Sequence, residues 1–224
     1  MSQIIIGYTT EGTTDIRLLE SIILRTFIKV GFECNKQIEV ISPVIYIKKA
    51  AGETFVEQVF QSSKNAYENG IMAFCIHVDA DFPNDTRAMD YKMTPALSNI
   101  SESIELSICK NLVSLIPVRM SESWMLADKE LLKDEIGTNL SDIALGINHY
   151  AESYADPKTT ISNAILIALQ QRTKRRRKEL PISELYQPIG QKISLDKLEA
   201  LPSYLKFKEG VRNAYRKLNY LPPL

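Results

Sequence analysis

The sequence predicts an α/β fold, with a mainly parallel sheet flanked by helices and a helical C-terminal extension. Short runs rich in Ile and Val alternate with longer segments whose apolar residues recur at helical spacing. The run 71–78 is apolar almost throughout, which is typical of a strand covered on both faces. Later in the chain, helical patterns follow one another without strands. We therefore expect an α/β domain over residues 1–135 and a helical region over residues 136–224.

The first elements alternate strand and helix. Residues 3–8 predict a strand that stops at a turn rich in Thr and Gly, and residues 15–30 predict an amphipathic helix. Residues 37–47 predict a second strand, in which Pro43 favours an edge position or a bulge. Residues 54–69 predict a helix leading to the apolar strand. This order implies right-handed crossovers and parallel strands.

After residue 78 the sequence predicts one more strand and several helices. A loop after the apolar strand precedes a predicted helix, 94–110, and a last strand, 112–118. The later predicted helices are 126–136, one that begins at Asp156-Pro157, and 203–218.

Composition indicates an ordinary globular protein. The 224 residues are 45% hydrophobic and 24% charged, enough for one substantial core. Cys34, Cys75 and Cys109 are far apart and odd in number, which indicates core residues in a reducing compartment rather than a zinc site or a disulfide framework. The apolar run 4–6 is too short for a signal peptide or a membrane span. We expect a cytoplasmic protein with no membrane partner.

The net charge of zero conceals an uneven distribution. Residues 1–150 carry 13 Lys and Arg against 20 Asp and Glu, whereas residues 151–224 carry 14 against 7. An acidic half followed by a basic half is typical of a metal-centred site with an anion-binding extension, although chance imbalance is the ordinary alternative.

Four acids follow three predicted strands. Glu11 follows the first strand, Asp79 and Asp81 end the apolar strand, and Glu122 follows the last. On a continued strand Asp79 and Asp81 would point the same way, and the carboxyl ends of parallel strands meet at one edge of the sheet. Each acid alone has a simpler explanation as a strand end or helix cap. Together they predict a site for one or two Mg2+ or Mn2+ ions that could activate water against a phosphodiester.

The acidic motifs resemble those of a known family. Glu11-Gly12-Thr13-Thr14-Asp15 after one strand and Asp79-Ala80-Asp81 after another resemble the signature motifs of the Toprim domain of primases, topoisomerases and overcoming-lysogenization-defect (OLD) nucleases. The run from Glu122 to Asp128, followed by Asp156-Pro157-Lys158, is similar to the Toprim-like family DUF4276.

The resemblance implies a Toprim-like catalytic domain and a nuclease. In it, Glu11 would be the general acid/base or a metal ligand, Asp79 and Asp81 would bind Mg2+ or Mn2+, and Glu122 would complete the ligand shell. Asp15 is a weaker candidate, because an acid in the first turn of a helix also favours the helix dipole. The resemblance further implies defence against phage and a separate ATPase partner, since the chain has no phosphate-binding loop.

A basic run predicts contact with nucleic acid. Positive charge at this density exceeds what solubility requires, although it also suits the end of a helix. Contacts of this kind would hold a phosphate backbone without reading its sequence. The residues are Arg172, Lys174, Arg175, Arg176, Arg177 and Lys178.

Several alternatives stay open. His77 is either a further ligand or a hydrogen-bonded interior residue, and Arg119 either stabilises a phosphate or pairs with an acid. The chain has no nucleophile elbow, which argues against acyl transfer. Two other functions compete with the nuclease: an idle Toprim-like sensor or scaffold subunit, and a nucleotidyl or glycosyl transferase with an Asp-x-Asp metal site.

Overall fold

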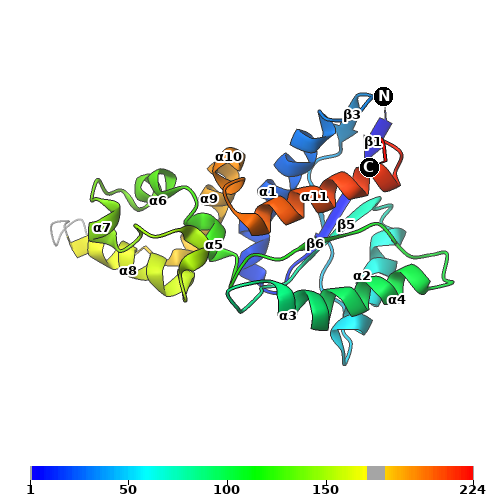
Figure 1. Cartoon of the computed structure of the whole chain (residues 1–224), viewed down its shortest axis with the longest axis horizontal. Coiled ribbons are helices and arrows are strands. Elements are labelled where there is room, and N and C mark those ends of the chain that lie inside the picture. The colour runs from blue at the N-terminus through cyan, green and yellow to red at the C-terminus, as the bar shows by residue number, and fades with distance from the viewer. Residues whose placement is uncertain (1, 171–179, 224) are drawn as a thin grey trace.

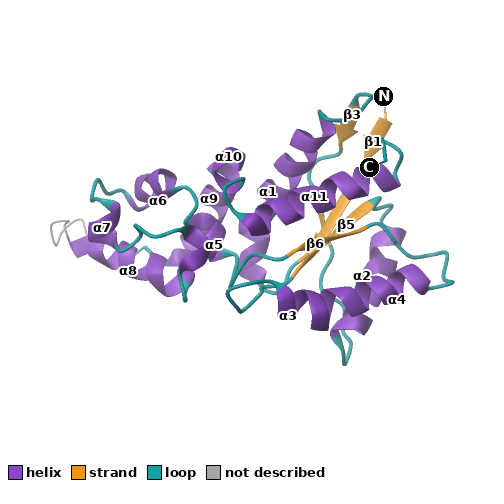
Figure 2. Ribbon diagram, in the orientation of Figure 1, coloured by secondary structure: helices purple, strands orange, loops and turns teal. Residues whose placement is uncertain are grey.

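The structure is a computed structural model that describes residues 2–170 and 180–223. It consists of a parallel sheet with helices on both faces, and a group of helices beyond one end of the sheet (Figure 1). The predicted fold class is therefore confirmed: a mainly parallel sheet flanked by helices, with C-terminal helices. Figure 2 shows that the strands are short and that helices make up most of the chain.

All strand pairs in the sheets are parallel. The four-stranded sheet has the order β4-β2-β5-β6, and β1 pairs with β3 in a separate two-stranded sheet. The strands are β1 (Ser2–Ile4), β2 (Ile6–Thr9), β3 (Ile38–Val40), β4 (Ile45–Tyr46), β5 (Ala73–His77) and β6 (Leu112–Leu115).

The helices cover the sheet first and then form the outer group. In chain order they are α1 (Thr13–Gly31), α2 (Phe55–Glu68), α3 (Thr86–Ala88), the π-helical turn η1 (Met89–Met93), α4 (Thr94–Glu102), α5 (Glu122–Met125), α6 (Lys129–Ile136), α7 (Asp142–Leu145), the 3₁₀ turn η2 (Ala151–Ser153), α8 (Pro157–Gln170), the 3₁₀ turn η4 (Ile182–Glu184), α9 (Tyr186–Lys192), α10 (Leu195–Leu198) and α11 (Pro202–Lys217).

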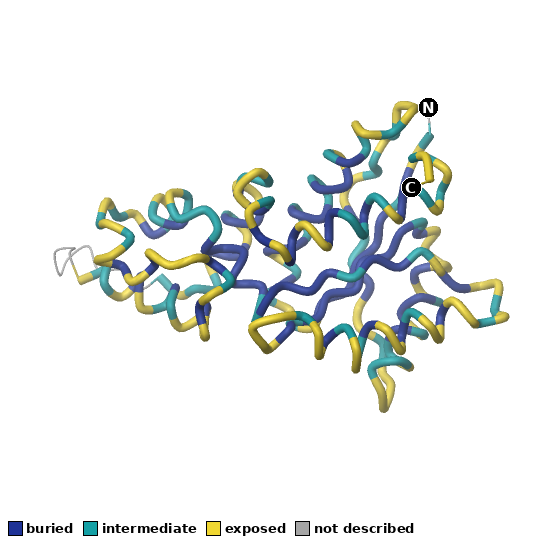
Figure 3. Tube along the Cα trace, viewed as in Figure 1, coloured by how far each residue is buried: buried dark blue, intermediate teal, exposed yellow. Residues whose placement is uncertain are grey.

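Side chains alternate between the two faces of the sheet and pack into two hydrophobic clusters, one on each face. Val113 and Leu115 of β6 point into the cluster formed with α1 and α11, whereas Leu112 and the following Ile116 belong to the cluster formed with α2 and α4. Every residue of β5 is buried, as Figure 3 shows for the centre of the sheet. A strand buried on both faces accounts for the apolar run in the sequence.

Two predicted strands are each divided in the structure. Residues 3–8 form β1 and β2, which belong to different sheets, and residues 37–47 form β3 and β4. Pro43 lies between β3 and β4, where its missing N–H costs no ladder hydrogen bond. Of the two expectations for this proline, β4 shows the edge position, although Pro43 itself lies outside the strand.

Two predicted helices have different limits in the structure. The helix expected over 94–110 ends at Glu102, and the π-helical turn precedes it. The helix expected over 126–136 begins at Lys129, because the Asp128 carboxylate accepts the Leu131 N–H as an N-cap.

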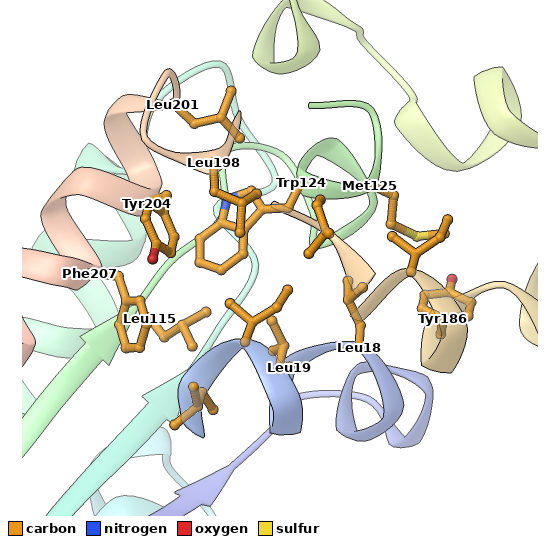
Figure 4. Close-up of a cluster of buried hydrophobic side chains, with 14 of the residues drawn as sticks. Leu18, Leu19, Leu115, Trp124, Met125, Tyr186, Leu198, Leu201, Tyr204 and Phe207 are labelled. Carbon is orange, nitrogen blue, oxygen red and sulfur yellow. The ribbon is translucent and has the colours of Figure 1, made fainter. Parts of the chain in front are cut away.

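The outer helices pack onto the same hydrophobic cluster as the sheet. Trp124 of α5 packs edge-on against Tyr204 of α11, with ring centroids 5.5 Å apart, and donates its indole N–H to Ser203 (2.8 Å). Leu18 and Tyr186 join them from α1 and α9 (Figure 4). The division at residue 135 stays a prediction, and packing across it is continuous.

An arginine joins α1 to the helical region. Arg25 donates to the carbonyls of Gly190 (2.7 Å) and Ile193 (2.6 Å) at the C-terminus of α9. A guanidinium there satisfies main-chain acceptors that have no partner within the helix. Gly190 packs directly against the main chain of Leu18, where a β-carbon would not fit.

Some expectations concern the chain as a whole. Within the described residues, no helix combines the length and apolar character needed to cross a membrane. Cys34, Cys75 and Cys109 are free thiols, and the last two are buried. The predicted nucleic-acid contacts at Arg172 and 174–178 lie outside the described residues.

Candidate functional site

Glu11 and Asp79 lie side by side at the carboxyl edge of the sheet. They follow β2 and β5, which are neighbouring strands, by two residues each. The Glu11 carboxylate accepts the main-chain N–H of Asp79 at 3.1 Å. The structure thus brings together two of the four acids predicted from the sequence, because β2 and β5 pair in parallel.

His77, the last residue of β5, lies beneath this pair and is 2% exposed. The Glu11 N–H donates to its Nδ1 (3.3 Å), so the proton of the neutral ring is on Nε2. Nε2 lies 3.3 Å from Asp79 Oδ1 but outside hydrogen-bonding geometry. Burial lowers the pKa of His77, whereas the carboxylates around it, Asp79 foremost, outweigh burial and raise it. His77 is thus the interior neighbour of the acids.

Ser121 connects the acids to one another. Its main-chain N–H donates to Asp79 Oδ1 (3.0 Å), and its hydroxyl donates to Asp15 Oδ1 (2.5 Å). The same hydroxyl lies 3.5 Å from Glu122 Oε2. One serine therefore fixes Asp79 from the main chain and links the two acids behind it from the side chain.

Asp15 and Glu122 are buried in the wall behind Asp79, at 6% and 5% exposure. The second oxygen of Asp15 accepts the Gly12 N–H (3.1 Å) at the start of α1. Glu122 accepts the phenolic O–H of Tyr186, which reaches in from α9. Burial, followed by the bond to Glu122, raises the pKa of Tyr186, so this phenol keeps its proton and donates. Both buried acids are thus held by protein donors.

The cluster carries more negative charge than its neighbours offset. Burial first raises the pKa of Asp79; the charges of Asp15 and Glu11 add to this, while His77 opposes it. Lys92 Nζ lies 3.7 Å from Glu11 Oε1, at a partly exposed position. The mouth of the site therefore favours a further cation.

Asp81 lies at a turn of the main chain and is exposed. β5 ends at His77, and Asp81 has a left-handed main chain (φ +60°), with its N–H donated to the Arg119 carbonyl (2.8 Å). Its side chain is exposed. Parallel pairing continues past β5, because the Val78 and Ala80 N–H groups donate to the Leu115 and Pro117 carbonyls (both 3.2 Å), and it stops at Asp81. The extended geometry that would point Asp79 and Asp81 the same way is therefore lost at Asp81. The role of Asp81 as a ligand stays a prediction.

The donors suit a hard cation without enclosing it. Within residues 2–170 and 180–223, no three His, Cys, Asp or Glu side chains are grouped closely enough to hold a metal ion. Mg2+ is commonly bound by one or two carboxylates, with water and substrate phosphates as its other ligands. Glu11 and Asp79 provide such a pair, while Glu122 is occupied by Tyr186. The residues present thus fit an open Mg2+ or Mn2+ site at Glu11 and Asp79.

Comparison of the chain with protein-family models, with characterised proteins and with solved structures gave no match.

Sequence reasoning missed the residues that join the acids. Ser121 directly precedes Glu122, so its position after the last strand was a usable signal. Tyr186 is 64 residues from Glu122 and has no local signal, because only the packing of α9 against α1 brings it to the site. Lys92 follows the loop after β5, at the π-helical turn.

Proposed function

We propose that this protein is a Toprim-like nuclease that hydrolyses phosphodiester bonds of DNA or RNA with a divalent cation. The observation that carries the proposal is the adjacent Glu11 and Asp79 carboxylates at the carboxyl ends of neighbouring parallel strands. Two further acids, Asp15 and Glu122, stand behind them and increase the attraction for a cation. Sites of α/β sheets lie at this edge.

Glu11 and Asp79 are the residues that would hold Mg2+ or Mn2+. Bound there, the cation would polarise a phosphate oxygen and lower the pKa of a water. The chain's own part is to position its donors: the Ser121 N–H orients Asp79, and the Asp79 N–H orients Glu11. Glu11 is partly exposed and within reach of solvent, so its alternative role, with the cation held by Asp79, would be the general base that takes the proton from water.

The wider setting rests on the resemblance and on composition. We extend the proposal to a cytoplasmic role in phage defence beside a separate ATPase, with the basic residues 172 and 174–178 holding the nucleic-acid backbone. A reducing compartment agrees with three free thiols.

The test is cleavage of supercoiled plasmid and of single-stranded RNA with MgCl2 or MnCl2. Glu11→Gln and Asp79→Asn are each expected to reduce cleavage by about 100-fold or more, since each removes a ligand or base but keeps its size. Asp134→Asn, an exposed acid on α6, is the matched control and should cleave like the parent. Asp81→Asn tests the remaining predicted ligand. Cleavage that persists in both Glu11→Gln and Asp79→Asn would refute the proposal.

An idle sensor or scaffold subunit is the second candidate. It is favoured by the hydrogen bond that Tyr186 donates to Glu122, and by the exposed position of Asp81 after a left-handed turn. Titration of Mn2+ distinguishes the two functions: binding that depends on Asp79, without cleavage of any nucleic acid, favours the idle subunit. Turnover only with a nucleotide sugar would favour a transferase.

A further inference from the structure

A groove of about 1000 Å³ runs along the free edge of the sheet. Its floor is β6, whose residues Leu112 and Ser114 line it. One wall is α11, and the other is formed by α3, η1 and α4 (Figure 1). Gly210 lets α11 lie close to the floor, because a β-carbon there would approach the Val113 side chain to 3.1 Å.

The floor presents unused main-chain hydrogen-bonding groups. The carbonyls of Asn111 and Leu115 accept the N–H groups of Phe74 and Val78, so alternate residues of β6 face β5. By the alternation of a strand, the N–H and C=O of Leu112 and Ser114 face the groove. Among the described residues, no hydrogen bond to these main-chain groups is formed on that side. A sheet edge of this kind is a template for another strand.

The groove has a closed end and a basic end. Near the carboxyl end of β6, Lys206 of α11 forms an ion pair with Asp85 of the opposite wall (2.7 Å). At the other end, where α11 approaches Asn111, the groove is lined by Lys110 and Lys217. Neither lysine forms an ion pair with a carboxylate in the described part of the chain. The charge at this end therefore suits an acidic ligand.

The dimensions suit a short extended peptide. From Lys206 to Lys217 the helix α11 rises by about 17 Å, the length of about five extended residues. A second copy of the chain would present the same recessed edge, and two recessed edges cannot pair. A nucleic-acid strand is disfavoured because Asp85, Asp90 and Glu209 also line the walls.

We infer that this groove binds an extended segment of a partner protein by strand addition to β6. The segment uses the main chain of Leu112 and Ser114, and it carries an acidic side chain at the end that lies over Lys110 and Lys217. Main-chain hydrogen bonds supply affinity in this mode, and the end charge supplies direction. The site is separate from the carboxylates and does not depend on the proposed nuclease activity.

The test is selection of a phage-displayed library of random seven-residue peptides on the full chain. We expect enriched peptides with an acidic residue at one end and β-forming residues in the remainder. Ser114→Pro removes the outward N–H without touching the pairing with β5, and should weaken the enriched peptides by at least about tenfold. Ser114→Ala is the matched control and should bind like the parent.

The double variant Lys110→Glu/Lys217→Glu tests the groove without altering the strand. It should weaken the same peptides by at least about tenfold, and peptide binding should slow hydrogen exchange at the Leu112 and Ser114 amides. No enrichment, or enriched peptides that bind both the double variant and a folded Ser114→Pro as tightly as the parent, would overturn the inference. An oligonucleotide bound through Lys110 and Lys217, with no peptide enriched, would also overturn it and assign the groove to nucleic acid.

Discussion

Replacing Tyr186 by Phe tests whether the buried wall of the site depends on a helix outside the sheet. The substitution keeps the ring and removes only the hydroxyl that donates to Glu122. Glu122 is 5% exposed, and its other donor, the Ser121 hydroxyl, is 3.5 Å away and shared with Asp15. Loss of a hydrogen bond to a buried charge costs about 2 kcal/mol.

That cost should lower the melting temperature by about 4 to 8 °C for a chain of this size. The assay is thermal unfolding at neutral pH, followed by circular dichroism. Tyr220→Phe is the matched control: it removes a hydroxyl whose hydrogen bond to the Gln3 carbonyl (3.2 Å) is exposed, and it should cost less than about 0.5 kcal/mol.

A double-mutant cycle with Glu122→Gln isolates the contact. With a neutral acceptor, Tyr186→Phe should cost only about 1 kcal/mol, which leaves a coupling energy of about 1 kcal/mol. If Tyr186→Phe is no more harmful than Tyr220→Phe, the hydroxyl does not stabilise the buried acid and this account of the wall is wrong.

Three further substitutions address the charge at the site and the packing beside it. Asp79→Asn should raise the melting temperature at neutral pH, since burial and the neighbouring acids raise the pKa of Asp79 above its ordinary value of 3.8. A raised carboxyl pKa destabilises the folded state above that pKa, so the gain in a pH series of melts should shrink as pH falls and vanish below about 3.8; a gain that is unchanged at pH 3.5 would contradict this. Gly190→Ala should cost about 1 to 3 kcal/mol in urea unfolding, because a β-carbon would meet the Leu18 main chain, and a neutral result would mean that α9 moves freely from α1. Trp124→Ala should cost about 3 to 5 kcal/mol in the same assay, because it empties a fully buried position, and a cost below about 1 kcal/mol would contradict the packing of α5 against α11.

Local patterns in the sequence were sufficient to predict the sheet and the proximity of two acids. The alternation of apolar runs with helical segments implied parallel strands, and parallel strands bring Glu11 and Asp79 to one edge. Pro43 indicated an edge position or a bulge, and the strand that follows it, β4, lies at the edge of its sheet, because a missing N–H excludes proline from the centre of a sheet. These inferences succeeded where one local property had one structural outcome.

The parts that could not be predicted depend on contacts between distant segments. Asp81 adopts a left-handed main chain where β5 gives way to the Arg119 turn, and an Asp-x-Asp motif does not reveal whether its strand continues. Asp15 has the spacing of an acid that favours a helix dipole, yet it also accepts the Ser121 hydroxyl from a segment 106 residues away. Tyr186 reaches Glu122 only after α9 has packed on α1.

The position of α11 has a consequence for how the protein is made. The Tyr215 hydroxyl on this helix donates to the Phe27 carbonyl of α1 at 2.9 Å, across 188 residues of chain. A ribosome synthesises at about 5 to 20 residues per second, so α1 and the strands emerge many seconds before the helix that covers them. Until then the apolar faces of α1 and the strands are exposed to solvent or covered by a chaperone. Proteolysis of nascent chains should therefore show protection of α1 only after α11 has left the exit tunnel.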